Sequence, residues 1–366
     1  LGIALKIKSA LPTSLEKASS AIKGAAASAS AAAATAATAI ARAPPAPPAA
    51  ATIVVDSGGE AANVVGVEWD RAPLFRCSLS DDFAPKLRGC PPPTLLQVAP
   101  SAEDGDGGTF EAVFVLPPPA PAPPPLVVMP HGGPHSVVTA SFNPQVAYLT
   151  AAGYATLIVN YRGSSGFGAD ALESLPGKVG TQDVDDVIAA IDAAARHVDV
   201  DRIHVAGGSH GGFLACHLVL RDARIKAAAI RNPVTNVAAM WGISDIPDWT
   251  IVEACGVDAD PRATPTAEQL AKMWAVSPIA RPLVGGQPGR VVPPCLFLLG
   301  MKDRRVPPSQ GLHFAAALRQ AGSAARIRSY PDDCHPLETV GTEMDAWVQS
   351  LLLFEEAANT ETQSLC

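Results

Sequence analysis

The chain has no excess of basic residues, and it is poor in charge and in aromatic rings. Of its 366 residues, 17% are charged and 5% are aromatic, and the formal net charge at pH 7 is −8. Nucleic acids and anionic membranes favour a basic protein surface, so neither kind of partner is expected. Hydrophobic residues make up 48% of the chain, which supplies enough apolar material for a sizeable core.

Paired cysteine motifs are missing as well. The seven cysteines are widely spaced and include no C-x-x-C pair. Because zinc sites and disulfide frameworks depend on short, regular cysteine spacings, we expect neither in this chain. The thiols are expected to be reduced and mostly to fill the core, as in a cytoplasmic protein.

A Leu-rich signal core is absent from the first part of the sequence. The uncharged stretch between Lys23 and Arg42 consists mostly of Ala, Ser and Thr, which are too weakly apolar to span a membrane. Residues 1–50, which end in a Pro-rich run, are expected to form a disordered low-complexity tail. Their acid-poor composition also resembles an organelle transit segment, which leaves import as the alternative to a cytoplasmic location.

Two further regions follow this tail. Short apolar runs at 52–55 and 63–67 predict strands in a small β-rich remnant, residues 51–108. Between residues 109 and 358, apolar runs alternate with amphipathic segments. The predicted strands are 109–116, 126–129, 155–159, 203–206, 226–230, 295–299 and 325–330, and the predicted helices are 180–198, 213–220, 308–319 and 338–354. This alternation predicts an α/β domain whose mostly parallel sheet carries helices on both faces, followed by a flexible end at 359–366.

The strongest local motif is G-x-S-x-G, which occupies residues 207–211 with Ser209 at its centre. An apolar strand precedes the motif and an apolar helix follows it. This context is typical of the nucleophile elbow of α/β hydrolases, where a sharp turn exposes the serine and glycines allow close backbone approach. The alternative for such a turn is a phosphate-binding loop at a helix N-terminus. A candidate base and a candidate acid later in the chain favour the nucleophile elbow of an α/β hydrolase over the phosphate-binding loop.

The chain order in α/β hydrolases places an acid after the serine and the histidine last. Three histidines lie beyond the elbow motif. His217 lies on the helix that begins at the elbow, and His313 lies within a later helix. His335 instead follows a predicted strand, and active-site groups collect at the carboxyl ends of strands. We therefore predict His335 as the general base, and Asp303, which follows the preceding strand, as the acid that orients it.

A Pro-His-Gly-Gly-Pro-His loop at residues 130–135 directly follows a predicted strand. In α/β hydrolases the loop at this position directs a backbone N–H at the oxyanion. We predict Gly133, with Gly132 beside it, and the N–H of His210 as the oxyanion donors. The two histidines of the loop have no acidic or cysteine partner at ligand spacing, so no metal site is expected.

Six collinear stretches of the sequence resemble the prolyl oligopeptidase family of serine peptidases, and three of them resemble its acylaminoacyl-peptidase (acyl-peptide hydrolase) branch. The family-wide stretches are 131–136, 160–168 and 207–212, and the branch-specific stretches are 231–234, 244–249 and 303–307. Ser209, Asp303 and His335 fall on the catalytic positions of that family.

The resemblance implies a cofactor-free peptidase that releases an N-acylated residue from the start of a short peptide, and a cytoplasmic homo-oligomer. Arg231, at the end of the strand after the elbow, is a candidate substrate-binding residue, with a structural ion pair as the alternative. The family places a β-propeller before the catalytic domain, and only residues 51–108 could represent its last strands. Two alternatives therefore stay open: a carboxylesterase with the same triad, and an inactive truncated product.

Overall fold

The computed structural model describes residues 84–87, 89–100, 108–281 and 292–364. The predicted tail 1–50 and the strands predicted at 52–55 and 63–67 lie outside the described residues. Within the described part of the chain, no helix is both long and apolar enough to cross a membrane. The cysteines found there as free thiols are Cys90, Cys216, Cys255, Cys295 and Cys334.

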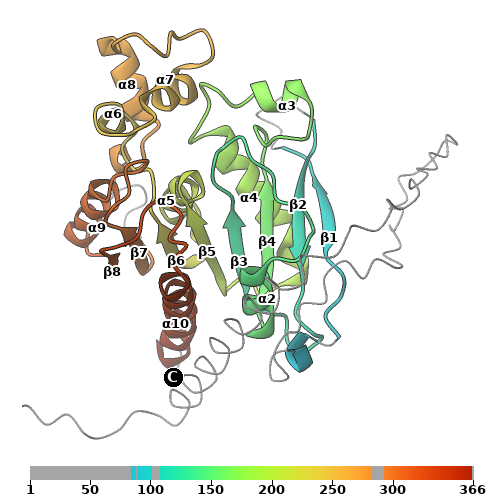
Figure 1. Ribbon diagram of the computed structural model, residues 1–366. Helices are drawn as coiled ribbons and strands as arrows, with labels where there is room; N and C mark the ends of the chain where they lie inside the picture. Colours follow the sequence, from blue (N-terminus) through green and yellow to red (C-terminus); the bar gives the residue numbers. More distant parts are fainter. Residues whose placement is uncertain (1–83, 88, 101–107, 282–291, 365–366) are drawn as a thin grey trace, which may run out of the picture. The chain divides into compact units, whose positions relative to one another are not determined.

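In the described residues, eight strands form one sheet in the order β1-β2-β4-β3-β5-β6-β7-β8 (Figure 1). Their bounds are β1 Thr94–Val98, β2 Phe110–Val115, β3 Leu126–Pro130, β4 Ala155–Asn160, β5 Ile203–Gly208, β6 Ile225–Arg231, β7 Cys295–Gly300 and β8 Ala325–Tyr330. β2 is antiparallel to both of its neighbours, and the pairs from β4 through β8 are all parallel. The predicted mostly parallel sheet is confirmed. β4 and β7 are buried along their whole length, which explains their continuous apolar runs.

The sheet begins earlier in the chain than the sequence pattern predicted. β1 pairs with β2 from Thr94 opposite Phe114 to Val98 opposite Phe110, within the segment 51–108 that the sequence pattern predicts as a separate remnant. The compact unit that contains the sheet begins at Lys86. β1 lies at the sheet edge and buries only Val98, so it carries no apolar run by which it could be recognised.

Helices cover both faces of the sheet, as predicted. α4, α5 and α9 share a core on one face through residues such as Ile191, Phe213 and Phe314. α2 and α10 pack on the other face through residues such as Leu149 and Leu353. The bounds of the described α-helices are α2 Pro144–Ala151, α3 Ala169–Glu173, α4 Gln182–Ala194, α5 His210–Arg221, α6 Val237–Met240, α7 Pro247–Cys255, α8 Ala267–Ala275, α9 Ser309–Gln320 and α10 Val340–Ser364, and 3-10 helices occupy Ala84–Leu87, Ala195–His197 and Pro278–Ala280.

The last helix is longer than predicted. α10 runs to Ser364, past the predicted end at Phe354 and into the segment 359–366 that was expected to be flexible. The sequence after Phe354 loses its apolar stripe, but it contains Glu and Ala, which favour helix without tertiary contacts.

Among the described residues, three α-helices and one 3-10 helix lie in an insertion between β6 and β7. α6, α7 and α8 pack against one another and lie beyond one end of the strands (Figure 1). Because the insertion leaves the sheet at the carboxyl end of β6, it lies on the side where active-site groups collect in open α/β sheets.

Candidate active site

Ser209 lies at the turn between β5 and α5 and adopts φ 60° and ψ −123°, in the left-handed region that a residue with a side chain rarely occupies. The surrounding glycines make this turn possible. A Cβ at Gly207 would overlap the carbonyl oxygen of Gly211, and a Cβ at Gly211 would overlap that of Pro130. The chain therefore turns sharply enough to present the serine hydroxyl above the end of the sheet.

Substituting Gly211 with Ala is expected to destabilise the protein by about 2–4 kcal/mol, because the new methyl group has to displace the Pro130 backbone. Urea unfolding measures the difference. Gly341→Ala is the matched control, since nothing lies within 4 Å of a Cβ at this position near the start of α10. It should be neutral or stabilise the fold by up to about 1 kcal/mol. Equal effects of the two substitutions would contradict the close packing at the elbow.

The structure brings Ser209, His335 and Asp303 into one hydrogen-bonded row. The Nε2 atom of His335 lies 2.9 Å from Ser209 Oγ, and its Nδ1 atom lies 2.6 Å from Asp303 Oδ2. The Asp303 side chain is fully buried, whereas the His335 side chain is 24% exposed. A hydroxyl, an imidazole and a buried carboxylate in this order can pass a proton from the serine to the imidazole while the carboxylate holds the ring tautomer.

Backbone groups hold the Asp303 carboxylate, and Asn232 holds the loop that carries His335. Asp303 Oδ1 accepts hydrogen bonds from the N–H groups of Arg305 and Val306, each 2.9 Å long. Asn232 has φ 40° and donates through Nδ2 to the carbonyl oxygen of His335 at 2.9 Å. Its Oδ1 accepts from Gly300 N, also at 2.9 Å. Sequence reasoning missed Asn232, because an asparagine after a strand has no catalytic signature.

The other histidines beyond the elbow, and the two aspartates close to His335 in the sequence, lie elsewhere. His217 Nε2 contacts the carbonyl oxygen of Val276 at 3.0 Å, and His313 is exposed on α9. Asp332 pairs with Lys302 at 2.9 Å, and Asp333 accepts a hydrogen bond from Thr339. None of these carboxylates contacts the His335 ring among the described interactions.

The glycine loop lies against the serine. A Cβ at Gly132 would sit 3.4 Å from Ser209 Cβ, so glycine permits this approach. The indole Nε1 of Trp249 donates to the carbonyl oxygen of Gly133 at 3.1 Å, which fixes the plane of that peptide group. His210 is the first residue of α5, where backbone N–H groups have no acceptor within the helix. The predicted oxyanion donors therefore lie on the two segments that flank Ser209.

Side-chain pairs anchor both segments, a fully buried one at His210 and a partly exposed one at His135. The His210 ring contacts Asp183 Oδ2 through Nε2 at 2.8 Å, and both side chains are fully buried. In the glycine loop, His135 bridges the carbonyl oxygen of Gly163, at 2.7 Å, and Glu253, at 3.2 Å. The hydrogen bond to Glu253 raises the pKa of His135.

The other histidine of the loop, His131, stacks on Tyr161 with ring centroids 4.5 Å apart. Burial lowers the pKa of His131 to about 4, so its ring is neutral at neutral pH. The two histidines of the glycine loop thus contact protein groups that hold the loop in place.

A cavity of about 290 Å³ opens at the serine and is lined by Ser209, His335 and Gly133 together with mostly apolar side chains. The remaining lining residues are Val234, Met240, Ile246, Trp249, Arg305 and Val306. Three of them come from α6, α7 and the segment that joins these helices. Sequence reasoning did not assign these residues, because single apolar side chains in a helical segment also serve as core.

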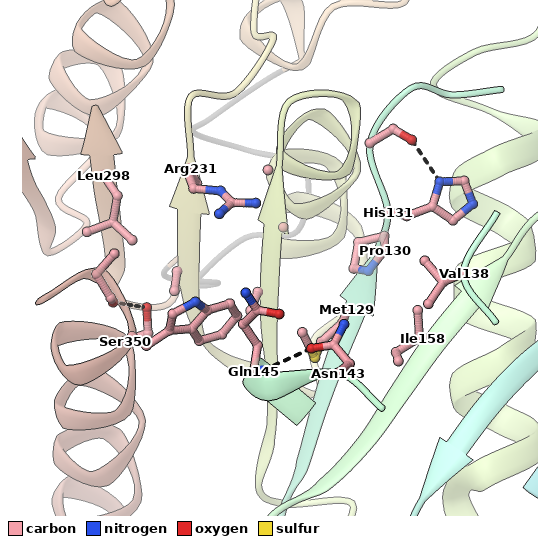
Figure 2. Close-up of a pocket in the computed structure, with 17 residues that line it drawn as sticks. Met129, Pro130, His131, Val138, Asn143, Gln145, Ile158, Arg231, Leu298 and Ser350 are labelled. Carbon is pink, nitrogen blue, oxygen red and sulfur yellow. Dashed lines mark hydrogen bonds between the residues drawn. The ribbon is translucent and has the colours of Figure 1, made fainter. Parts of the chain in front are cut away.

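Arg231 does not line this cavity. Its side chain enters a second cavity of about 240 Å³, which shares no lining residue with the first (Figure 2). A Cβ at Gly208 would lie 2.8 Å from Arg231 Nε, so the side chain packs on the elbow backbone. The expected role of Arg231 in substrate binding stays a prediction.

A mostly parallel sheet with helices on both faces, carrying a serine on a sharp turn after a central strand, defines the chain as an α/β hydrolase. The sequence pattern of the prolyl oligopeptidase family matches residues 140–360, and the chain belongs to that family.

Curated relatives and solved structures agree with this assignment. The acylamino-acid-releasing enzyme of Arabidopsis thaliana is 46% identical over 63% of this chain and 30% of its own length. The human acylamino-acid-releasing enzyme is 41% identical over 70% of this chain and 35% of its own length. The crystal structure of a puromycin hydrolase, 28% identical, superposes on 74% of this chain and 40% of its own with a TM-score of 0.64. The chain thus spans about a third of the length of the curated relatives it matches.

Proposed function

We propose that the chain is a serine peptidase that releases an N-acylated amino acid from the start of short peptides through an acyl-enzyme. The observation that carries the proposal is the position of His335, 2.9 Å from the Ser209 hydroxyl and 2.6 Å from the Asp303 carboxylate. The names of the curated relatives supply the substrate class.

In the proposed reaction, Ser209 Oγ attacks the carbonyl carbon of the acylated residue while His335 Nε2 takes the hydroxyl proton. The oxyanion that forms accepts hydrogen bonds from the N–H groups of Gly133 and His210. His335 then gives its proton to the leaving amine, and the shortened peptide departs. A water molecule then attacks the carbonyl carbon of the acyl-enzyme while His335 takes its proton. This step releases the N-acyl amino acid as a carboxylate and restores the Ser209 hydroxyl. Asp303 stabilises the His335 imidazolium during both the formation and the hydrolysis of the acyl-enzyme.

The apolar cavity at Ser209 supports an acylated substrate over one with a free amino terminus. Met240, Ile246 and Trp249 supply apolar walls close to the site of attack. A free ammonium group carried into such surroundings loses its hydration and gains no carboxylate there, because among the lining residues the one fixed charge is the cation Arg305. An acetyl group removes that charge.

Turnover of three substrates tests this function. Acetyl-Ala-p-nitroanilide is expected to be cleaved with a kcat/KM at least about tenfold above that of unacylated Ala-p-nitroanilide, because the ammonium group is costly to desolvate. A p-nitrophenyl ester serves as the third substrate. Hydrolysis of the ester alone would identify a carboxylesterase and contradict the peptidase. Preference for the free amino terminus would contradict the acylated substrate class.

A further inference from the structure

The second cavity lies beside the elbow, on the face of the sheet that α2 and α10 cover. Its apolar walls include Met129, Val138, Ile158, Leu298 and Trp347. Figure 2 shows the Arg231 guanidinium projecting into this space from β6, with Leu298 and Ser350 on one side and Pro130 and His131 on the other. Gly208 lines this cavity and Ser209 lines the first, so the backbone of the elbow separates the two.

The part of the chain that the structure describes gives the Arg231 guanidinium no counter-ion in contact. Among the described residues, no side chain forms a hydrogen bond or an ion pair with its guanidinium. Burial lowers the pKa of Arg231, and Glu343 on α10 opposes that shift. An arginine keeps its proton even so, and a half-buried guanidinium among apolar side chains gains from pairing with an anion.

The charges around the cavity indicate how many negative charges an occupant would carry. Arg231 is the one charged side chain among the described lining residues, because burial keeps the His131 ring neutral. Glu343 accepts a hydrogen bond from Gln145 Nε2 at 2.6 Å instead of pairing with Arg231. One guanidinium balances one negative charge, so a monoanion fits better than a dianion.

We propose that this cavity is a binding site for a small organic carboxylate, held by Arg231 behind the oxyanion loop and separate from the Ser209 cavity. The carboxylate accepts a two-pronged hydrogen bond from the guanidinium, a geometry that arginine is suited to provide. The apolar walls take the hydrocarbon part of the ligand, which a bare inorganic anion lacks. Since Arg231 packs against Gly208, the occupant lies one residue away from the nucleophile without touching it.

Isothermal titration calorimetry with 3-methylbutanoate tests the site, because this carboxylate is not a product of the proposed peptidase and binding is read without turnover. The neutral 3-methylbutanamide and inorganic phosphate serve as comparison ligands. Wild-type protein should bind the carboxylate at least about tenfold more tightly than the amide, since the charged hydrogen bonds are lost with the amide. Equal binding of carboxylate and amide, or tighter binding of phosphate, would overturn the proposal.

Two variants locate the binding. Arg231→Met should weaken carboxylate binding at least about tenfold, whereas Arg305→Met, which removes the arginine of the Ser209 cavity, should leave it unchanged. Weaker binding in Arg305→Met together with unchanged binding in Arg231→Met would place the ligand in the Ser209 cavity and contradict the inference. Thermal unfolding checks that Arg231→Met is folded. If it is not, Glu343→Gln decides, because removing that competing carboxylate should tighten binding about two- to fivefold, and no tightening would count against the site.

Discussion

Replacing Ser209 with Ala is expected to lower kcat for acetyl-Ala-p-nitroanilide by about 10⁵- to 10⁶-fold, leaving the rate that binding and the oxyanion donors alone support. The methyl group cannot attack the carbonyl, and His335 Nε2 loses the hydroxyl it contacts at 2.9 Å. Cβ and the backbone stay as they are, so φ 60° is held at the same cost. KM should change little, because the hydroxyl contributes mainly to the transition state.

A fluorophosphonate probe gives an independent measurement on the same variant. The probe phosphonylates activated serines, so labelling should appear on wild-type protein and disappear from Ser209→Ala. The control is Ser141→Ala, which removes an exposed serine that hydrogen-bonds only Thr139 among the described residues and should leave labelling intact. Undiminished labelling of Ser209→Ala would reject this serine as the nucleophile. Absent labelling of wild-type protein would favour the inactive product.

Asp303→Asn is expected to lower kcat by about 10⁴-fold while the fold remains intact. The asparagine Oδ1 can keep the hydrogen bonds from Arg305 N and Val306 N, which orients its NH₂ group toward His335 Nδ1. That group donates where the carboxylate accepted, so it favours the tautomer with the proton on Nε2. A protonated Nε2 cannot take the proton of Ser209.

Asp332→Asn is the matched control for this substitution. Asp332 lies three residues before His335, but its side chain is 94% exposed and pairs with Lys302 at the surface. Exposed ion pairs contribute little, so turnover should stay within about threefold of wild type. A loss comparable to that of Asp303→Asn would show that loop charge, and not the buried acid, controls the histidine. A small loss in Asp303→Asn itself would reject Asp303 as the orienting acid.

The periodicity of apolar residues predicted the parts of the fold that are buried on both sides. β3 and β7 carry uninterrupted apolar runs, and β4 and β5 are mostly apolar, each with one polar residue inside the run; strands of this kind occur in covered parallel sheets. The apolar pattern does not predict β1, because its outer residues, such as Thr94 and Leu95, face solvent. Its place in the sheet depends on pairing with β2, which no local pattern encodes.

The candidate triad followed from motif and chain order, whereas its surroundings did not. Ser209 carries a glycine signature that backbone geometry requires, and only a histidine beyond a strand end could reach it. Trp249 reaches Gly133 through a hydrogen bond from an insertion, and the position of an insertion is set by tertiary packing. The same holds for Arg231, because its position in the sequence does not say which of two neighbouring cavities the guanidinium enters.

The sheet and the insertion between β6 and β7 supply different parts of the Ser209 cavity. Ser209, Asp303 and His335 stand at the ends of strands, whereas Met240, Ile246 and Trp249 come from the excursion between β6 and β7. If the proposed function holds, exchanging this insertion should change which acyl group is accepted while leaving the contacts among Ser209, His335 and Asp303 in place. Trp249 is the exception, since it lines the cavity and its indole also donates to the carbonyl oxygen of Gly133. Replacing Trp249 would therefore disturb the glycine loop beside Ser209 as well as the cavity wall.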